Sequence, residues 1–373
     1  MIDNKSILPI AIFVAVLIAV AAGMKFSSLR RHHQADANAA LLGLWEDNRH
    51  DYSASKASKV TVVLIKAALE RGADVNAIDS SSGRKTPLML AALSGNLPSV
   101  EYLVSNNANV NAKATGGYTA LMMAAKSGNL ACVEYLVDRG ADVAARIDSG
   151  KSTIMWAVEG GNVNCVKYLM SKGADIHASE QGFTALMQAA ALGNFDCTRL
   201  LCSEGLSVND RDHYGNTPLH SAAESRNVKC VMFLIAHGAD VNSRSNAGMT
   251  PLMVAAEFNR LDTIKFLIHQ HAPIGAMDNI GNTALNWAIN PHSDSSCVSY
   301  LIANGSNVNA KDYGGMTSLM NASASGALAC VKCLLLNGAD VNVKDKSGRT
   351  ALSLALERHH PDIIAILKAA GAK

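Results

Sequence analysis

Six cysteines recur in similar surroundings along this chain of 373 residues, and recurring cysteines can hold a metal, form disulfides or carry redox chemistry. Two of the segments read CVEYLVDRGADV (132–143) and CVKYLMSKGADI (165–176). The six are Cys132, Cys165, Cys197, Cys230, Cys297 and Cys330, and each lies eight residues before a glycine. Other segments place Leu64, Ser99, Thr263 or Ile363 there. A place that accepts such different side chains indicates packing, where a free cysteine behaves as a small hydrophobe.

The remaining candidates for chemistry are a C-x-x-C motif and two pairs of histidines. Cys330 and Cys333 form the motif, but it lies within an apolar helical stretch and has no second pair beside it, as a zinc site needs. The histidines at 32–33 and 359–360 are adjacent, so they point to different sides of a helix and chelate poorly. The sequence therefore predicts no enzyme, no catalytic residues, no metal site and no cofactor. A thiol- or metal-dependent enzyme is the rival hypothesis from another class.

The cysteines belong to a repeated unit. A Thr or Ser followed two residues later by Leu or Ile recurs at spacings of 32 to 34 residues. The starts are Thr86, Thr119, Ser152, Thr184, Thr217, Thr250, Thr283, Thr317 and Thr350. This residue can cap a short first helix, and a second helix ends at a Gly suited to left-handed backbone. Two helices this short are unstable alone in water, so neighbouring units must stack.

The pattern resembles the ankyrin repeat family. Residues 217–220 read TPLH, which is the family's motif in full, and most units close in GADVN or a relative. The resemblance implies an all-α solenoid of about nine regular repeats with hairpin-like projecting loops. Two units depart from the pattern because Asn107 and His271 replace the helix-stop Gly, and another carries an extra residue and Pro291 in its helix-to-helix turn.

An apolar run at Ile7–Met24 stands apart from the repeats. As a helix of about 1.5 Å per residue it reaches roughly 27 Å, enough to cross a bilayer. Lys25, Arg30 and Arg31 follow the run, which favours a single-pass anchor with the repeats in the cytoplasm. A cleaved signal peptide is the alternative, because Ala19-Val20-Ala21 offers a cleavage site, and the repeats would then be exported or periplasmic.

These observations divide the chain into five parts. They are an N-terminal tail (1–6), a transmembrane helix or signal peptide (7–24), a basic juxtamembrane linker (25–34), an atypical N-terminal capping repeat (35–78) and the ankyrin repeat domain (79–373). The capping repeat is expected to begin with a helix capped at Asp36 and to end with a second helix from Val60 to Arg71. An end repeat differs from the others because one of its sides must face water.

The resemblance also implies that the protein binds a partner through the concave face of the solenoid. The candidates lie four, seven or eight places after each cap, or in the loop just before it, because aromatic and Met side chains often anchor interfaces. They are Tyr118, Trp156, Phe183, Tyr214, Met249, Phe258 and Trp287, with Trp156 and Trp287 expected in the same groove. Packing between neighbouring loops is the alternative for each. A basic residue recurs at one loop place, at Lys113, Arg146, Arg211, Arg244, Lys311 and Lys344.

The charge balance limits the kinds of partner. The formal net charge is +2, which gives no sign of the strongly basic surface that nucleic-acid binding needs. The expected partners are another protein and the membrane, with no nucleic acid and no small-molecule substrate. The expected function is that of a membrane-tethered scaffold or specific inhibitor, and a toxin-neutralising immunity protein is one form of the latter.

Overall fold

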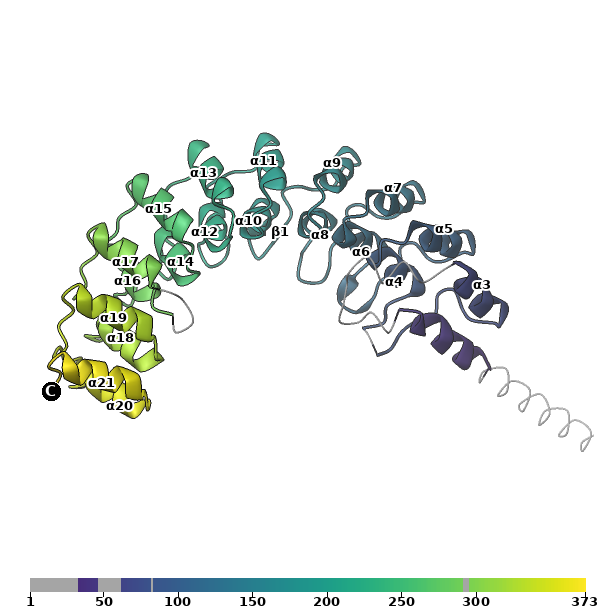
Figure 1. Ribbon diagram of the computed structural model, residues 1–373. Helices are drawn as coiled ribbons and strands as arrows, with labels where there is room; N and C mark the ends of the chain where they lie inside the picture. The colour runs from purple at the N-terminus through teal and green to yellow at the C-terminus, as the bar shows by residue number, and fades with distance from the viewer. Residues whose placement is uncertain (1–32, 46–61, 82, 291–294) are drawn as a thin grey trace, which may run out of the picture. The chain divides into compact units, whose positions relative to one another are not determined.

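The computed structural model describes residues 33–45, 62–81, 83–290 and 295–373. The chain divides into two compact units, Met1–Ala174 and Asp175–Lys373, and both consist of consecutive helix pairs (Figure 1). The apolar run at 7–24 and most of the segment between the two capping helices lie outside the described residues. Within the described ranges, no helix combines the length and the apolar character needed to cross a membrane.

In the described part of the first unit, residues 33–43 are helical and α3 (Val62–Glu70) is the next described helix. Three helix pairs follow: α4 (Pro87–Leu93) with α5 (Leu97–Ser105), α6 (Ala120–Ser127) with α7 (Leu130–Asp138), and α8 (Thr153–Glu159) with α9 (Val163–Ser171). A short 3-10 helix, η2 (Thr115–Gly117), lies in the loop before α6. The expected start at Asp36 is wrong, because His33 and Gln34 already belong to the first helix.

The second unit begins with a hairpin of two short strands, β1 (Ser179–Glu180) and β2 (Phe183–Thr184), which pair antiparallel. The helix pairs are α10 (Ala185–Ala191) with α11 (Phe195–Ser203), α12 (Pro218–Glu224) with α13 (Val228–Ala236), α14 (Pro251–Glu257) with α15 (Leu261–His269), α16 (Ala284–Trp287) with α17 (Ser296–Ala303), α18 (Ser318–Ser325) with α19 (Leu328–Leu336), and α20 (Ala351–Glu357) with α21 (Pro361–Ala369). The short α16 agrees with the irregular turn expected after it, although residues 291–294 are not among those described. Apart from the hairpin, the described chain has the expected all-α architecture.

Threonine side chains cap the helices at six of the nine predicted starts. The Thr86 hydroxyl accepts a hydrogen bond from the Met89 N–H (3.4 Å), and five other threonines do the same. An asparagine caps α7: Asn129 Oδ1 accepts from the Cys132 N–H (3.0 Å), while its Nδ2 donates to the Gly95 carbonyl of the preceding pair (2.8 Å). Such an asparagine therefore both starts a helix and joins two neighbouring repeats.

The recurring cysteines lie in the core. All six are at most 1% exposed, and all are free thiols. Burial is the main cause that raises the pKa of Cys132 to about 12 and that of Cys165 to about 11, so both thiols stay protonated at neutral pH. The prediction that this place is used for packing is confirmed for them.

Leu64 is the exception at the cysteine place, since it is 46% exposed. The Thr198 hydroxyl of α11 lies 3.8 Å from the Cys230 sulfur of α13, so this place faces the preceding second helix. Among the described residues, α3 is the earliest second helix and has no such neighbour before it. The expected packing role is therefore wrong for Leu64, while the adjacent Ile65 is fully buried.

Two residues other than glycine end second helices in left-handed backbone, as expected. Asn107 has a φ of 67° and His271 a φ of 60°. A Cβ in this conformation costs about 1–2 kcal/mol because it crowds the following carbonyl oxygen, and asparagine tolerates it better than histidine. The native structure therefore carries local strain at His271.

Replacing His271 by Gly is expected to raise the free energy of unfolding by about 1 kcal/mol, because the change removes this strain at an exposed position. The midpoint of urea unfolding at an unchanged slope measures the effect. The matched control is Gly238→Ala, where φ is 89° and a Cβ would meet no atom within 4 Å. It should lower stability by about the same amount. A neutral or destabilising His271→Gly change would contradict the assignment of strain.

Candidate functional site

Backbone hydrogen bonds join the loops that precede the first helices. In the second unit the Asn246 N–H donates to the Tyr214 carbonyl (2.8 Å), and the Tyr313 N–H donates to the Ile280 carbonyl (3.0 Å). The same bond recurs from His213 to Gln181, Asn279 to Ala247 and Lys346 to Gly314 in this unit, and from Thr115 to Gly83 and Asp148 to Gly116 in the first. The loop tips of each unit are thus tied into a row.

Aspartates brace three of these tips in the second unit. The Oδ1 atom of Asp212 accepts hydrogen bonds from the N–H groups of Tyr214 (2.9 Å) and Asn216 (2.8 Å). Asp278 binds the N–H groups of Ile280 (2.9 Å) and Asn282 (2.8 Å), and Asp312 binds that of Met316 (2.8 Å). Hydrogen bonds to a carboxylate are stronger than neutral ones, so the tips hold their shape.

Large apolar side chains project from the braced tips. Tyr214 is 64% exposed, Ile280 60% and Tyr313 60%. We call these three the tip row. The sequence pointed to Tyr214 but missed Ile280, although Ile280 lies three residues before its cap, the same place that Tyr214 occupies. The tip row presents apolar surface from a fixed backbone.

In the first unit the structure brings Tyr118 and Trp156 together. Their ring centroids are 5.6 Å apart, and both rings line an open cleft of about 350 Å³. Lys85, Met123 and Lys126 also line this cleft, as do Gly83, Leu93, Ala114 and Thr115. Trp156 is only 8% exposed, however, so it forms the base of the cleft rather than a projecting anchor.

Two lysines and one glutamate surround Trp156. The Nζ atoms of Lys126 and Lys151 lie 5.0 and 3.9 Å from the Trp156 ring centroid, at cation–π distance. The Glu159 carboxylate pairs with both ammonium groups, at 2.9 Å to Lys126. Burial would raise the pKa of Glu159, but hydrogen bonds from Lys151 and Lys126 outweigh it and hold the pKa below its usual value.

The other predicted residues have separate surroundings in the second unit. Trp287 is half-buried and its Nε1–H donates to Asp278 Oδ2 (3.0 Å), which ties α16 to its own loop. Phe183 in β2 and Met249 are half-buried, and Phe258 is 37% exposed after α14. Because Trp156 and Trp287 belong to different units, the structure does not test whether they share a groove.

Two of the basic residues that recur at one loop place form hydrogen bonds between neighbouring loops. The guanidinium of Arg211 donates to the carbonyl of Arg244, and the guanidinium of Arg244 donates to the carbonyl of Met277. Each arginine thus binds the backbone of the next repeat. These contacts add to the backbone bonds that fix the loops.

The candidates for metal or thiol chemistry lie apart from these surfaces. In the described part of the chain, no three His, Cys, Asp or Glu side chains gather in a way that could hold a metal ion. Cys333 lies inside α19 with Cys330, and burial raises its pKa. The C-x-x-C motif is therefore part of a packed second helix, as expected.

The helix pairs, the capped starts and the tied loops define a repeat protein in which consecutive helix pairs stack within each compact unit. The family model for ankyrin repeats (3 copies) matches residues 52–147, 144–212, 205–278, 243–312 and 292–373. The chain therefore belongs to the ankyrin repeat family, whose members generally mediate protein–protein interaction. A comparison with curated proteins found no match.

Replacing Glu159 by Gln is expected to lower the free energy of unfolding by about 1 kcal/mol at pH 7, because two lysines lose their charged partner. The folded-state pKa of Glu159 lies below its unfolded value of about 4.3. Its contribution is thus present above that value and is lost as the pH falls through the folded pKa. The difference between wild type and variant should shrink from pH 5 to pH 3 in urea titrations.

Glu101→Gln is the control, since Glu101 is exposed and makes no ion pair with any described residue. Its effect should be small at every pH. A Glu159→Gln difference that stays constant across this range would show that the lysine contacts do not stabilise the ionised carboxylate.

Proposed function

We propose that this protein is a non-enzymatic interaction module that binds another protein through its loop tips and the adjoining first-helix face. The tip row of the second unit is the observation that carries this proposal: Tyr214, Ile280 and Tyr313 are all at least 60% exposed on loops tied by hydrogen bonds. Exposed apolar side chains at fixed positions are typical of interaction surfaces. Membership of the ankyrin repeat family supports the same role.

The rigidity of these loops favours tight binding. Ordering a flexible loop costs free energy upon association, and loops already braced by Asp212, Asp278 and Asp312 avoid much of that cost. Tyrosine contributes a large contact area at a low cost in side-chain entropy. In the first unit, the cleft beside Tyr118 offers a similar combination, with an aromatic base and lysines at its rim.

The biological role that we propose is that of a scaffold or a specific inhibitor held at a membrane. The apolar run at 7–24 with Lys25, Arg30 and Arg31 behind it supports a single-pass anchor with the repeats in the cytoplasm. In this account residues 35–78 cap the array and residues 79–373 form about nine regular repeats. A toxin-neutralising immunity protein is a particular form of the inhibitor role.

Replacing Tyr214 by Ala is expected to weaken partner binding by about 2 kcal/mol or more, because the change removes an exposed aromatic contact. The melting temperature should hardly change, since the side chain is 64% exposed. The partner is first captured from the native cell with the full chain, and affinities are then measured by titration calorimetry. Trp156→Ala, by contrast, should lower the melting temperature because that ring is buried.

Lys167→Ala is the matched control on the second helix α9, where the exposed side chain should affect neither binding nor melting. If Tyr214→Ala and a Tyr313→Ala variant both bind the captured partner with wild-type affinity, the tip row is not the interface.

The anchor makes a separate prediction about topology. A reporter fused after Lys373 should be active in the cytoplasm, and residues 7–24 should remain on the mature protein. N-terminal sequencing of the membrane fraction measures the second point. Cleavage near Ala21 together with an exported reporter would establish the signal-peptide alternative instead.

A further inference from the structure

The turn between the first and second helix of a repeat follows one pattern in four consecutive repeats. It reads Gly-Asn at 95–96, 128–129, 161–162 and 193–194. The glycines take φ values from 64° to 77°, which suits their lack of a Cβ. The next two repeats break the pattern, because their turns read Arg226-Asn227 and Asn259-Arg260. Arginine thus replaces one member of the pair in each of two adjacent turns.

These replacements change the local backbone and the capping. Without the glycine, the chain leaves α12 through extended backbone at Ser225, with φ −70° and ψ 164°, and Arg226 is exposed. In the next turn Asn259 takes the left-handed place with φ 55°. Arg260 stands where an asparagine caps other second helices, and α15 has no side-chain cap. Its Nε–H instead donates to the Glu224 carbonyl (2.7 Å), which fixes the guanidinium.

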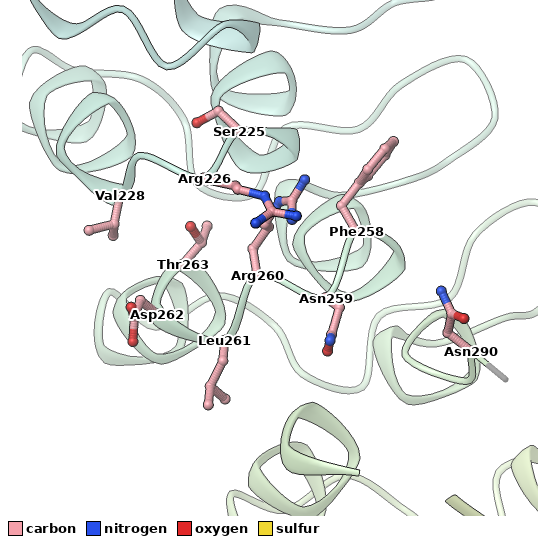
Figure 2. Close-up of a pocket in the computed structure, with 10 residues that line it drawn as sticks. All are labelled: Ser225, Arg226, Val228, Phe258, Asn259, Arg260, Leu261, Asp262, Thr263 and Asn290. Carbon is pink, nitrogen blue, oxygen red and sulfur yellow. The ribbon is translucent and has the colours of Figure 1, made fainter. Parts of the chain in front are cut away.

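The two arginines line an open cleft of about 520 Å³ within the second unit. Figure 2 shows their guanidinium groups projecting toward each other from the two turns. Burial and then the charge of Arg226 lower the pKa of Arg260, which agrees with this proximity. Within the described part of the chain, neither guanidinium forms an ion pair with an acidic side chain. Two like charges therefore lie close together in this cleft.

The rest of the lining combines apolar and amide groups. Phe258 is 37% exposed, and the guanidinium carbon of Arg260 lies 5.9 Å from its ring centroid. Val228 and Leu261 add apolar surface. The Oδ1 atom of Asn259 is buried and has no hydrogen-bond partner among the described residues.

We propose that this cleft binds an acidic segment of a partner protein, with an Asp or Glu carboxylate held between Arg226 and Arg260 and a neighbouring apolar side chain on Phe258. The inference rests on the proposed protein-binding function and adds a second surface, at the helix-to-helix turns, to the tip row. Guanidinium groups match carboxylates because each can donate two parallel hydrogen bonds.

The charges around the cleft favour one carboxylate over a polyanion. Asp262 lines the cleft, and Glu224 lies close enough to Arg260 and Glu257 to affect both. Burial and the charge of Glu224 raise the pKa of Glu257. A nucleic-acid strand would bring successive phosphates against these acidic groups, whereas a single side chain needs only the space between the two arginines.

The test is a selection with the full chain in mild detergent. A phage-displayed library of random dodecapeptides is depleted on the Arg226→Ala/Arg260→Ala variant and then selected on wild type. The enriched peptides should contain Asp or Glu next to an apolar residue. Labelled peptides should bind at least tenfold more weakly to Arg226→Ala, as judged by fluorescence anisotropy, and peptides with Gln in place of the acid should lose as much. Arg226→Ala should fold normally because no described contact depends on its guanidinium.

Lys229→Ala is the control, because it removes an exposed positive charge from the neighbouring helix α13 and should leave peptide affinity unchanged. Enrichment of peptides without acidic residues, or equal binding by Arg226→Ala, would overturn the inference. Arginine-dependent binding of a 20-nucleotide oligothymidylate that exceeds peptide binding would overturn it too, as would a dimer of this chain that Arg226→Ala abolishes. Failure to select acidic peptides, with a native partner still captured through Tyr214, would overturn this inference and leave the proposed function standing.

Discussion

Helices of seven to nine residues do not hold their shape alone in water, so the described helices of this length depend on the helices packed beside them within each compact unit. Within each unit, first helices pack against first helices and second helices against second helices. The places that meet carry side chains such as Cys165, Leu169 and Ala189, which are fully buried. Close packing between neighbouring helices thus explains both the period of the sequence and its high content of small apolar residues.

Because stacking uses the helix faces, the loops and turns are free to differ from one repeat to the next. Polar ties such as the one from Asn129 to Gly95 hold neighbouring turns together, and backbone bonds hold neighbouring loops. Both proposed surfaces lie on these connections. The tip row lies on the loops, and the cleft between Arg226 and Arg260 lies where the turns leave the Gly-Asn pattern. The scaffold therefore fixes the position of residues that do not themselves support the stack.

The sequence predicted the features that recur in the repeats, because one repeat can be compared with the next. The helix pairs, the Thr caps and the buried cysteines are of this kind. The sequence could not show which neighbours a side chain meets. Leu64 is exposed because, among the described residues, no earlier second helix lies beside it. Trp156 is buried beside two lysines, whereas Trp287 at the same place of its repeat is half-buried. Gly160 has an ordinary φ of −67°, yet a Cβ there would lie 2.3 Å from the Ala125 carbonyl oxygen, a contact that no local pattern reveals.

Hydrogen exchange after a single core deletion tests most directly whether stacking holds the array. Leu301 in α17 is fully buried, and Leu301→Ala removes packing from one second helix. If stability is a sum of nearest-neighbour contacts, amide protection should fall most in α17, less in α15 and α19, and little in α11. Equal loss of protection in all these helices would indicate one indivisible core. Loss confined to α17 would indicate helices that are stable without their neighbours, and either result would contradict the account.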